Sequence, residues 1–245
     1  MRRVLVGAAL AALLAVAAVA ASAPRWRSPE AEQIAHWLRR AADARDPQAE
    51  AALERWSGKG HLEARRAYIQ LLAHRGDADS RRRHVELLRR SAVEGDALAA
   101  TQLADLSFRH DPLAEANIDQ IERWYRQGAE GGVAAAARMI GILTLNGATD
   151  QAKVARAVGW FRKAAEAGDA NAMFLFANAL RAGQGVSRDE SQALVWYQRA
   201  ADADYAPALQ TLALAYRHGE LGLTIDSAQS RLMDHEAAEA LAHGR

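Results

Sequence analysis

The 245-residue chain contains no cysteine. Disulfide bonds, thiol nucleophiles and thiolate metal sites are therefore excluded, and the fold must be stabilised by packing alone. Aromatic residues are also scarce, at 6% of a chain that is 50% hydrophobic, so most of the apolar content is alanine and leucine. Both residues favour helices, and the small alanine side chain allows helices to pack closely. The composition predicts an all-α protein.

An excess of charge of either sign is missing as well. The chain has 31 Lys and Arg against 30 Asp and Glu, which gives a formal net charge of +1. A nucleic-acid-binding protein usually presents a clear basic surface to the phosphates. No nucleic-acid partner is therefore expected.

Motifs that carry catalysis are absent too. The sequence has no H-E-x-x-H, no G-x-S-x-G and no Walker-type glycine loop, so we predict no catalytic residue and no cofactor. His235 and His243 lie on one face of the last expected helix, with Glu239 between them. No third ligand is evident and the two histidines are eight residues apart, so no metal site is predicted. The chain is expected not to be an enzyme.

The N-terminal segment has the pattern of an export signal. Two arginines precede an uncharged apolar run from Val4 to Ala20, and Ala18-Val19-Ala20 matches the small-x-small site of signal peptidase. We expect residues 1–23 to be a cleaved signal peptide, which would place the mature protein in the periplasm or outside the cell. The alternative is an uncleaved anchor in the inner membrane formed by residues 4–22, since the run is long.

The rest of the chain contains a repeat. Trp124-Tyr125, Trp160-Phe161 and Trp196-Tyr197 follow one another at intervals of 36 residues. A fixed period in the range of about 20–50 residues indicates stacked supersecondary units. Leu87-Leu88 and Met233 occupy the same place in degenerate copies before and after.

Each repeat unit contains two amphipathic helices. One carries Ala193, Trp196-Tyr197 and Ala200-Ala201 at the spacing of a single buried helix face. The next carries small residues from Ala206 onward and ends at Gly219. Such faces can be buried only against neighbouring units. The large rings are expected to fill gaps between units, and the paired alanines to let helices approach.

The pattern resembles the Sel-one-like repeats, a branch of the tetratricopeptide-like helical repeat superfamily. The resemblance rests on Ala170-x-Ala172, the Gly183-x-Gly185-Val186 turn, Asp189, Ala193-x-x-Trp196-Tyr197 and Ala200-Ala201. It implies a right-handed α/α superhelix, or solenoid, of helix hairpins with a period of about 36 residues. At Gly147 the following turn lacks its second glycine, and His110 stands where a glycine is expected, so these two turns should be built differently.

Three segments are expected along the chain. Residues 1–23 form the signal or anchor, residues 24–60 form irregular capping helices, and residues 61–245 form the repeat array. The division after residue 60 follows Ser57-Gly58-Lys59-Gly60, which reads as a linker.

The resemblance also implies a candidate binding surface, because small-residue helices line the concave side of tetratricopeptide-like arrays. Polar and aromatic positions beside the buried residues of those helices should face a ligand. The candidate ligand-binding residues are Arg138, Asn171, Phe174, Asn178, Arg181, Gln210 and Arg217. Asn and Gln can pair with a peptide backbone, and Arg can bind a carboxylate through two donors.

The favoured hypothesis is an exported, non-enzymatic scaffold that binds a protein or peptide through its concave face, in envelope assembly or signalling. One alternative is a cell-wall-related enzyme or enzyme regulator, which the missing cysteines and the missing nucleophile and base disfavour. A second alternative is an inhibitor or immunity partner of a secreted protein.

Overall fold

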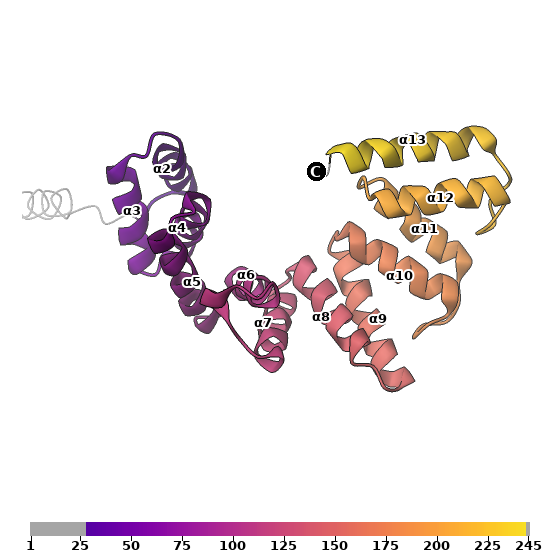
Figure 1. Ribbon diagram of the computed structural model, residues 1–245, viewed down its shortest axis with the longest axis horizontal. Helices are drawn as coiled ribbons and strands as arrows, with labels where there is room; N and C mark the ends of the chain where they lie inside the picture. The colour runs from indigo at the N-terminus through magenta and orange to yellow at the C-terminus, as the bar shows by residue number, and fades with distance from the viewer. Residues whose placement is uncertain (1–27, 244–245) are drawn as a thin grey trace, which may run out of the picture. The chain divides into compact units, whose positions relative to one another are not determined.

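The computed structural model describes residues 28–243, without the side chain of His243 (Figure 1). The expected signal or anchor at residues 1–23 lies outside the described residues. Twelve α-helices and one 3-10 turn make up the described part, and no strand occurs within it. The prediction of an all-α fold is therefore confirmed.

The helices follow one another with short connections, and their bounds are α2 (Ala31–Asp43), α3 (Pro47–Gly58), α4 (Leu62–Arg75), α5 (Ala78–Val93), α6 (Ala97–Phe108), η1 (Pro112–Ala114), α7 (Ile118–Glu130), α8 (Ala134–Asn146), α9 (Gln151–Glu166), α10 (Ala170–Ala182), α11 (Glu190–Ala201), α12 (Ala206–His218) and α13 (Ser227–His243). The chain divides into two compact units between His74 and Arg75. Within residues 28–243, none of the helices combines the length and the apolar character needed to cross a bilayer.

The first unit, residues 28–74, contains α2, α3 and nearly all of α4. Asp46 begins α3 by accepting hydrogen bonds from the backbone N–H groups of Gln48 and Ala49, and Pro47 at the first helical position suits that start. Leu53 of α3 and Leu72 of α4 are fully buried. A hydrophobic interior thus exists in this unit despite its irregular sequence.

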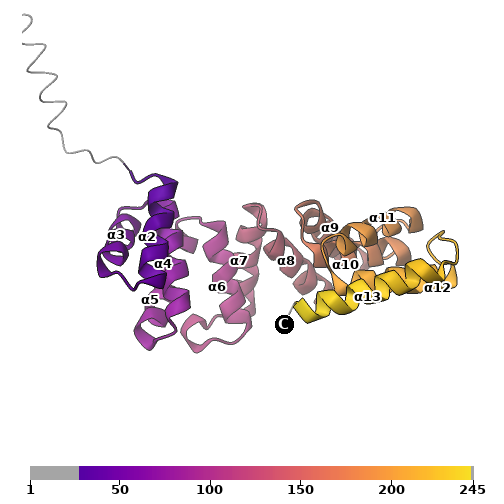
Figure 2. The ribbon, with the colours of Figure 1, turned by 90° about the horizontal axis from the view of Figure 1, so that it is seen from above.

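The second unit, residues 75–243, contains α5 to α13, and each α-helix packs against the next one in the chain (Figures 1 and 2). The connections between these helices are short. Antiparallel helix pairs joined in this way bury one face of each helix against its neighbours. The second unit is therefore an array of helix hairpins, as the repeat predicts.

The aromatic pairs provide the interior of this array, and the two members of a pair differ. The second member is buried in each case, with Tyr125 and Tyr197 at 0% exposure and Phe161 at 3%. The tryptophans before them are only partly buried, and Trp160 and Trp196 pack at the edge of the same apolar cluster. The ring that fills the space between helices is thus the second of each pair.

Turn geometry follows the glycine pattern. Gly183 and Gly219 end α10 and α12 in the left-handed region, with φ of 68° and 70°. Gly147 ends α8 with φ of −89°, and His110 takes φ of 58° after α6. The turn at Gly147 thus differs from the Gly183 turn, as predicted. His110 adopts the left-handed φ of Gly183 although it carries a side chain, so a different backbone conformation is not found there.

Candidate functional site

The seven predicted ligand-binding residues lie on three small-residue helices of the second unit. Arg138 lies on α8, Asn171, Phe174, Asn178 and Arg181 lie on α10, and Gln210 and Arg217 lie on α12. None of the seven is buried, so all remain accessible to a ligand to some degree. We call this set the candidate surface.

Two of these residues connect one small-residue helix to the start of the next. The Arg138 guanidinium lies 3.0 Å from the Asp169 carboxylate, and both side chains are largely shielded from solvent. Phe174, 36 residues after Arg138, packs its ring against that of Tyr205, with the centroids 5.5 Å apart. Asp169 and Tyr205 are the N-cap residues of α10 and α12. Each small-residue helix thus contacts the N-cap residue of the next small-residue helix. This contact is an ion pair in one repeat and a contact between two aromatic rings in the next.

A buried tyrosine positions Asn178. The Tyr197 hydroxyl donates a hydrogen bond of 2.6 Å to the Asn178 side-chain oxygen, and the Tyr197 ring lies 5.7 Å from the ring of Phe174. Burial raises the pKa of Tyr197, and the charge of Arg181 acts in the opposite direction. The hydroxyl thus stays protonated at neutral pH and can act as donor. Tyr197 holds Phe174 and Asn178 in place on α10.

The same arrangement occurs two repeats earlier. The Tyr125 hydroxyl donates a hydrogen bond of 2.7 Å to Asp105 on α6. Burial raises the pKa of Tyr125 first, and the hydrogen bond to Asp105 raises it further. Phe161, in the repeat between, has no hydroxyl, and Ile142 stands at the position that corresponds to Asp105 and Asn178. The repeats whose buried aromatic residue is a tyrosine therefore have an acceptor for its hydroxyl, Asp105 or Asn178, and the repeat with Phe161 has an apolar residue there.

The two remaining arginines form exposed ion pairs. Arg181 lies 2.6 Å from Glu220 in the turn after α12, and Arg217 lies 2.6 Å from Asp234 on α13. All four side chains are between 43% and 48% exposed. An exposed pair of this kind contributes only about 0–1 kcal/mol, so exchanging its carboxylate for one on a ligand costs little.

The structure joins some members of the candidate surface and leaves others apart. Phe174, Asn178 and Arg181 gather around Tyr197. Asn171 and Gln210 make no side-chain hydrogen bond or ion pair with the part of the chain that the structure describes. These two amides are therefore available to pair with a peptide backbone.

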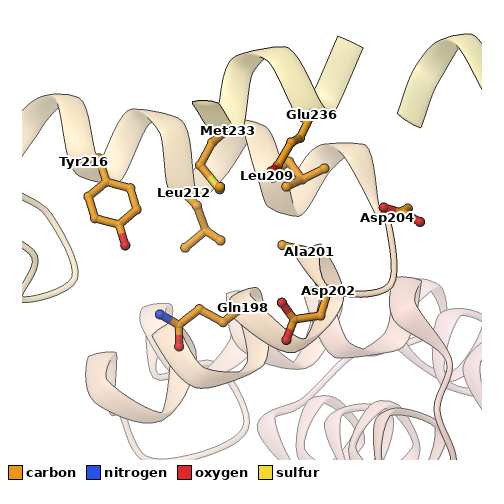
Figure 3. A pocket seen from close by; sticks show the side chains of 9 residues that line it. All are labelled: Gln198, Ala201, Asp202, Asp204, Leu209, Leu212, Tyr216, Met233 and Glu236. Carbon is orange, nitrogen blue, oxygen red and sulfur yellow. The ribbon is translucent and has the colours of Figure 1, made fainter. Parts of the chain in front are cut away.

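A cleft that the sequence did not indicate lies between α11, α12 and α13 (Figure 3). Its volume is about 500 Å³. Its lining includes three carboxylates and several apolar side chains, among them Asp202, Asp204, Glu236, Leu209, Leu212 and Met233. One signal was present in the sequence, because Met233 stands where the preceding repeats have Tyr197 and Phe161.

The structure shows no candidate metal site within residues 28–243. No group of three or more His, Asp or Glu side chains is placed there to hold a metal ion. His235 lies 3.7 Å from Glu239 one turn away on α13, which accounts for both side chains.

Comparison with known proteins shows what the repeat is similar to. The family model described as Sel1 repeat matches residues 35–46, 134–169 and 170–205. A solved Sel1 repeat protein from Oxalobacter formigenes is 22% identical with a TM-score of 0.74, and the alignment covers 86% of this chain and 88% of that one. A protective antigen of uropathogenic Escherichia coli with an SLR fold is 26% identical with a TM-score of 0.59, and the alignment covers 84% of this chain and 50% of that one. No curated protein matches the sequence.

Proposed function

Because this chain carries Sel1 repeats, which generally mediate interactions between proteins, we propose that it is an exported, non-catalytic scaffold that binds a segment of a partner protein. Sel1-repeat proteins are typically non-catalytic, and the lack of cysteine fits that role. The proposed site is the candidate surface of α8, α10 and α12.

The observation that carries the site is the equivalent placement of Arg181 and Arg217. The two arginines are 36 residues apart, and each pairs with an exposed carboxylate that follows the next small-residue helix or lies on the last helix: Glu220 for Arg181 and Asp234 for Arg217. Arg can bind a carboxylate through two parallel hydrogen bonds, and an acidic side chain or chain end of a partner would displace Glu220 or Asp234. Asn171 and Gln210 supply neutral donors and acceptors for the partner backbone. We therefore propose an extended or helical partner segment that carries acidic groups.

Capture of the partner by variants of the purified protein tests this site. The variant Arg181→Ala with Arg217→Ala is expected to retain at least about tenfold less partner from envelope extract, measured by quantitative mass spectrometry. The matched control is Arg82→Ala with Arg162→Ala, because these arginines are also exposed and paired with Asp79 and Glu166. Undiminished capture by the first variant together with loss in the control would place the site elsewhere.

Export is part of the proposal and has its own test. The small-x-small site at Ala18-Val19-Ala20 is expected to be cleaved, so the mature chain should begin near Ala21 in the periplasm or outside the cell. N-terminal sequencing of the protein from its native fraction measures this directly. Intact Met1 in a soluble cytoplasmic fraction would refute export, and intact Met1 in membranes would show a retained anchor instead.

A further inference from the structure

The cleft between α11, α12 and α13 lies where aliphatic residues stand in place of two rings of the preceding repeat. In the preceding repeat, Trp196 packs edge-on against Phe176, with the ring centroids 5.6 Å apart, and Tyr197 is fully buried beside them. The residues 36 positions after Phe176 and Tyr197 are Leu212 and Met233, and both line the cleft. Aliphatic side chains thus replace two aromatic ones, while Tyr216 of the lining stands where the preceding repeat has Leu180. Leu209 and Leu212 are themselves buried, and the partly exposed apolar residues of the lining are Ala201, Tyr216 and Met233. The floor of the cleft has room for an apolar side chain from outside.

The rim of the cleft is acidic. Asp202, Asp204 and Glu236 lie around it, and none of the three side chains makes a hydrogen bond or an ion pair with residues 28–243 (Figure 3). Asp202 is also the C-cap residue of α11, where the backbone carbonyls already concentrate negative charge. A cation bound here would offset both the carboxylates and the helix terminus.

Two of these carboxylates depart from the repeat pattern. Asp204 has φ of 53°, and the corresponding turn of the preceding repeat has Gly168, whose φ is 94°. An L-residue in this region costs free energy that glycine avoids. Glu236 stands where the preceding repeat has the fully buried Ala200. Asp204 and Glu236 are thus specific to the last repeat, whereas Asp202 corresponds to Glu166 of the preceding one.

The preceding repeats pair a basic residue with an aromatic ring next to the equivalent positions. Lys163 lies 4.3 Å from the ring centroid of Trp160, and Arg199 lies 4.7 Å from that of Trp196. In both, a basic residue follows an aromatic one by a single helical turn and covers its face. In the last repeat the corresponding residues are Leu232 and His235, so this ring and this permanent cation are both missing. These two residues precede the cleft residues Met233 and Glu236 in the sequence and do not themselves line the cleft.

We propose that the cleft binds a basic, aromatic segment of a partner protein, with a ring on the apolar floor and a neighbouring lysine or arginine at the acidic rim. Apolar floor and carboxylate rim together match that occupant and disfavour acidic or purely polar ligands. The cleft shares no residue with the candidate surface, so it is a second binding site.

Titration with synthetic peptides tests the proposal on the full chain. The probe is a capped hexapeptide with Trp-Arg-Lys at its centre, and binding is followed by fluorescence anisotropy and by the NMR signal of the Met233 methyl group. The same peptide with alanine in place of tryptophan, and one with glutamine in place of both basic residues, are each expected to bind at least about tenfold more weakly. A shift of the Met233 signal would place the ring on the floor.

Variants of the protein supply the matched controls. Asp202→Asn with Glu236→Gln is expected to weaken the Trp-Arg-Lys peptide at least about tenfold and to reduce the salt dependence of its binding. Asp119→Asn with Glu130→Gln on α7 removes the same net charge from an exposed helix face and should bind like the parent chain. Equal binding by both double variants, no binding by the parent chain or an unshifted Met233 signal would overturn the proposal. Because none of these variants touches Arg181 or Arg217, failure here leaves the candidate surface standing.

Discussion

Replacing Tyr197 by alanine is expected to destabilise the second unit by about 3–5 kcal/mol, the range for removing a large buried aromatic side chain. Tyr197 is fully buried in α11, and its ring contacts Phe174. The substitution also removes the hydroxyl that donates to Asn178. The free energy of unfolding from urea titration, followed by circular dichroism, measures the loss.

The control for this prediction lies on the same helix. Val195 is 44% exposed, and Val195→Ala should change the free energy of unfolding by no more than about 0.5 kcal/mol. Similar losses for the two substitutions would show that the buried face of α11 is assigned wrongly. Tyr197→Ala should also weaken partner capture, because Phe174 and Asn178 lose the side chain that positions them.

Enlarging Ala200 to leucine is expected to cost about 1–3 kcal/mol, because a larger side chain forces closely packed helices apart. Ala200 has 0% exposure, and Ala164 in the preceding repeat is equally buried. The measurement is again the free energy of unfolding. The array should lose stability without losing helical content in the native state.

An exposed alanine provides the comparison for Ala200→Leu. Ala152 lies on α9 with its side chain exposed, so Ala152→Leu adds the same atoms without crowding a neighbour. Its stability should stay within about 0.5 kcal/mol of the parent chain. If Ala200→Leu is as stable as Ala152→Leu, the two alanines do not differ in packing. The inference that helices approach closely at Ala200 would then be wrong.

The repeat was predictable from the sequence because its spacing is strict where packing is tight. Ala193, Tyr197 and Ala200 recur at helical spacing, and all three are fully buried in the structure. The different burial of Trp196 and Tyr197 was not predictable. Both are large and apolar, and only the packing of α11 against its neighbours decides which ring turns inward.

The candidate surface could be predicted as a set of residues but not as a set of contacts. Arg181 and Arg217 occupy equivalent positions of the repeat, which the period reveals. Their partners lie outside the regular pattern, Glu220 in a turn and Asp234 in the degenerate last helix. Pairs between residues 17 and 39 positions apart depend on how successive helices pack, and no local spacing rule reports them.

The cleft escaped prediction for a related reason. Its one signal in the sequence is Met233 in place of Tyr197 and Phe161, and by itself this reads as a conservative apolar replacement. Only the structure shows that the replacements of Phe176 by Leu212 and of Tyr197 by Met233 meet at one cleft, on two neighbouring helices. The carboxylates around that volume come from a helix end, a turn and a third helix.

The double role of Asp169 couples two neighbouring repeats. One carboxylate starts α10, through a 2.8 Å hydrogen bond from the Ala172 N–H, and holds Arg138 of α8. Fraying of α10 at its first turn therefore releases an anchor of the preceding repeat, and loss of Arg138 leaves the α10 cap without its ionic partner. In a linear chain of repeats, such nearest-neighbour coupling sets the cooperativity of unfolding. We therefore expect the repeats on either side of the Arg138–Asp169 link to unfold together.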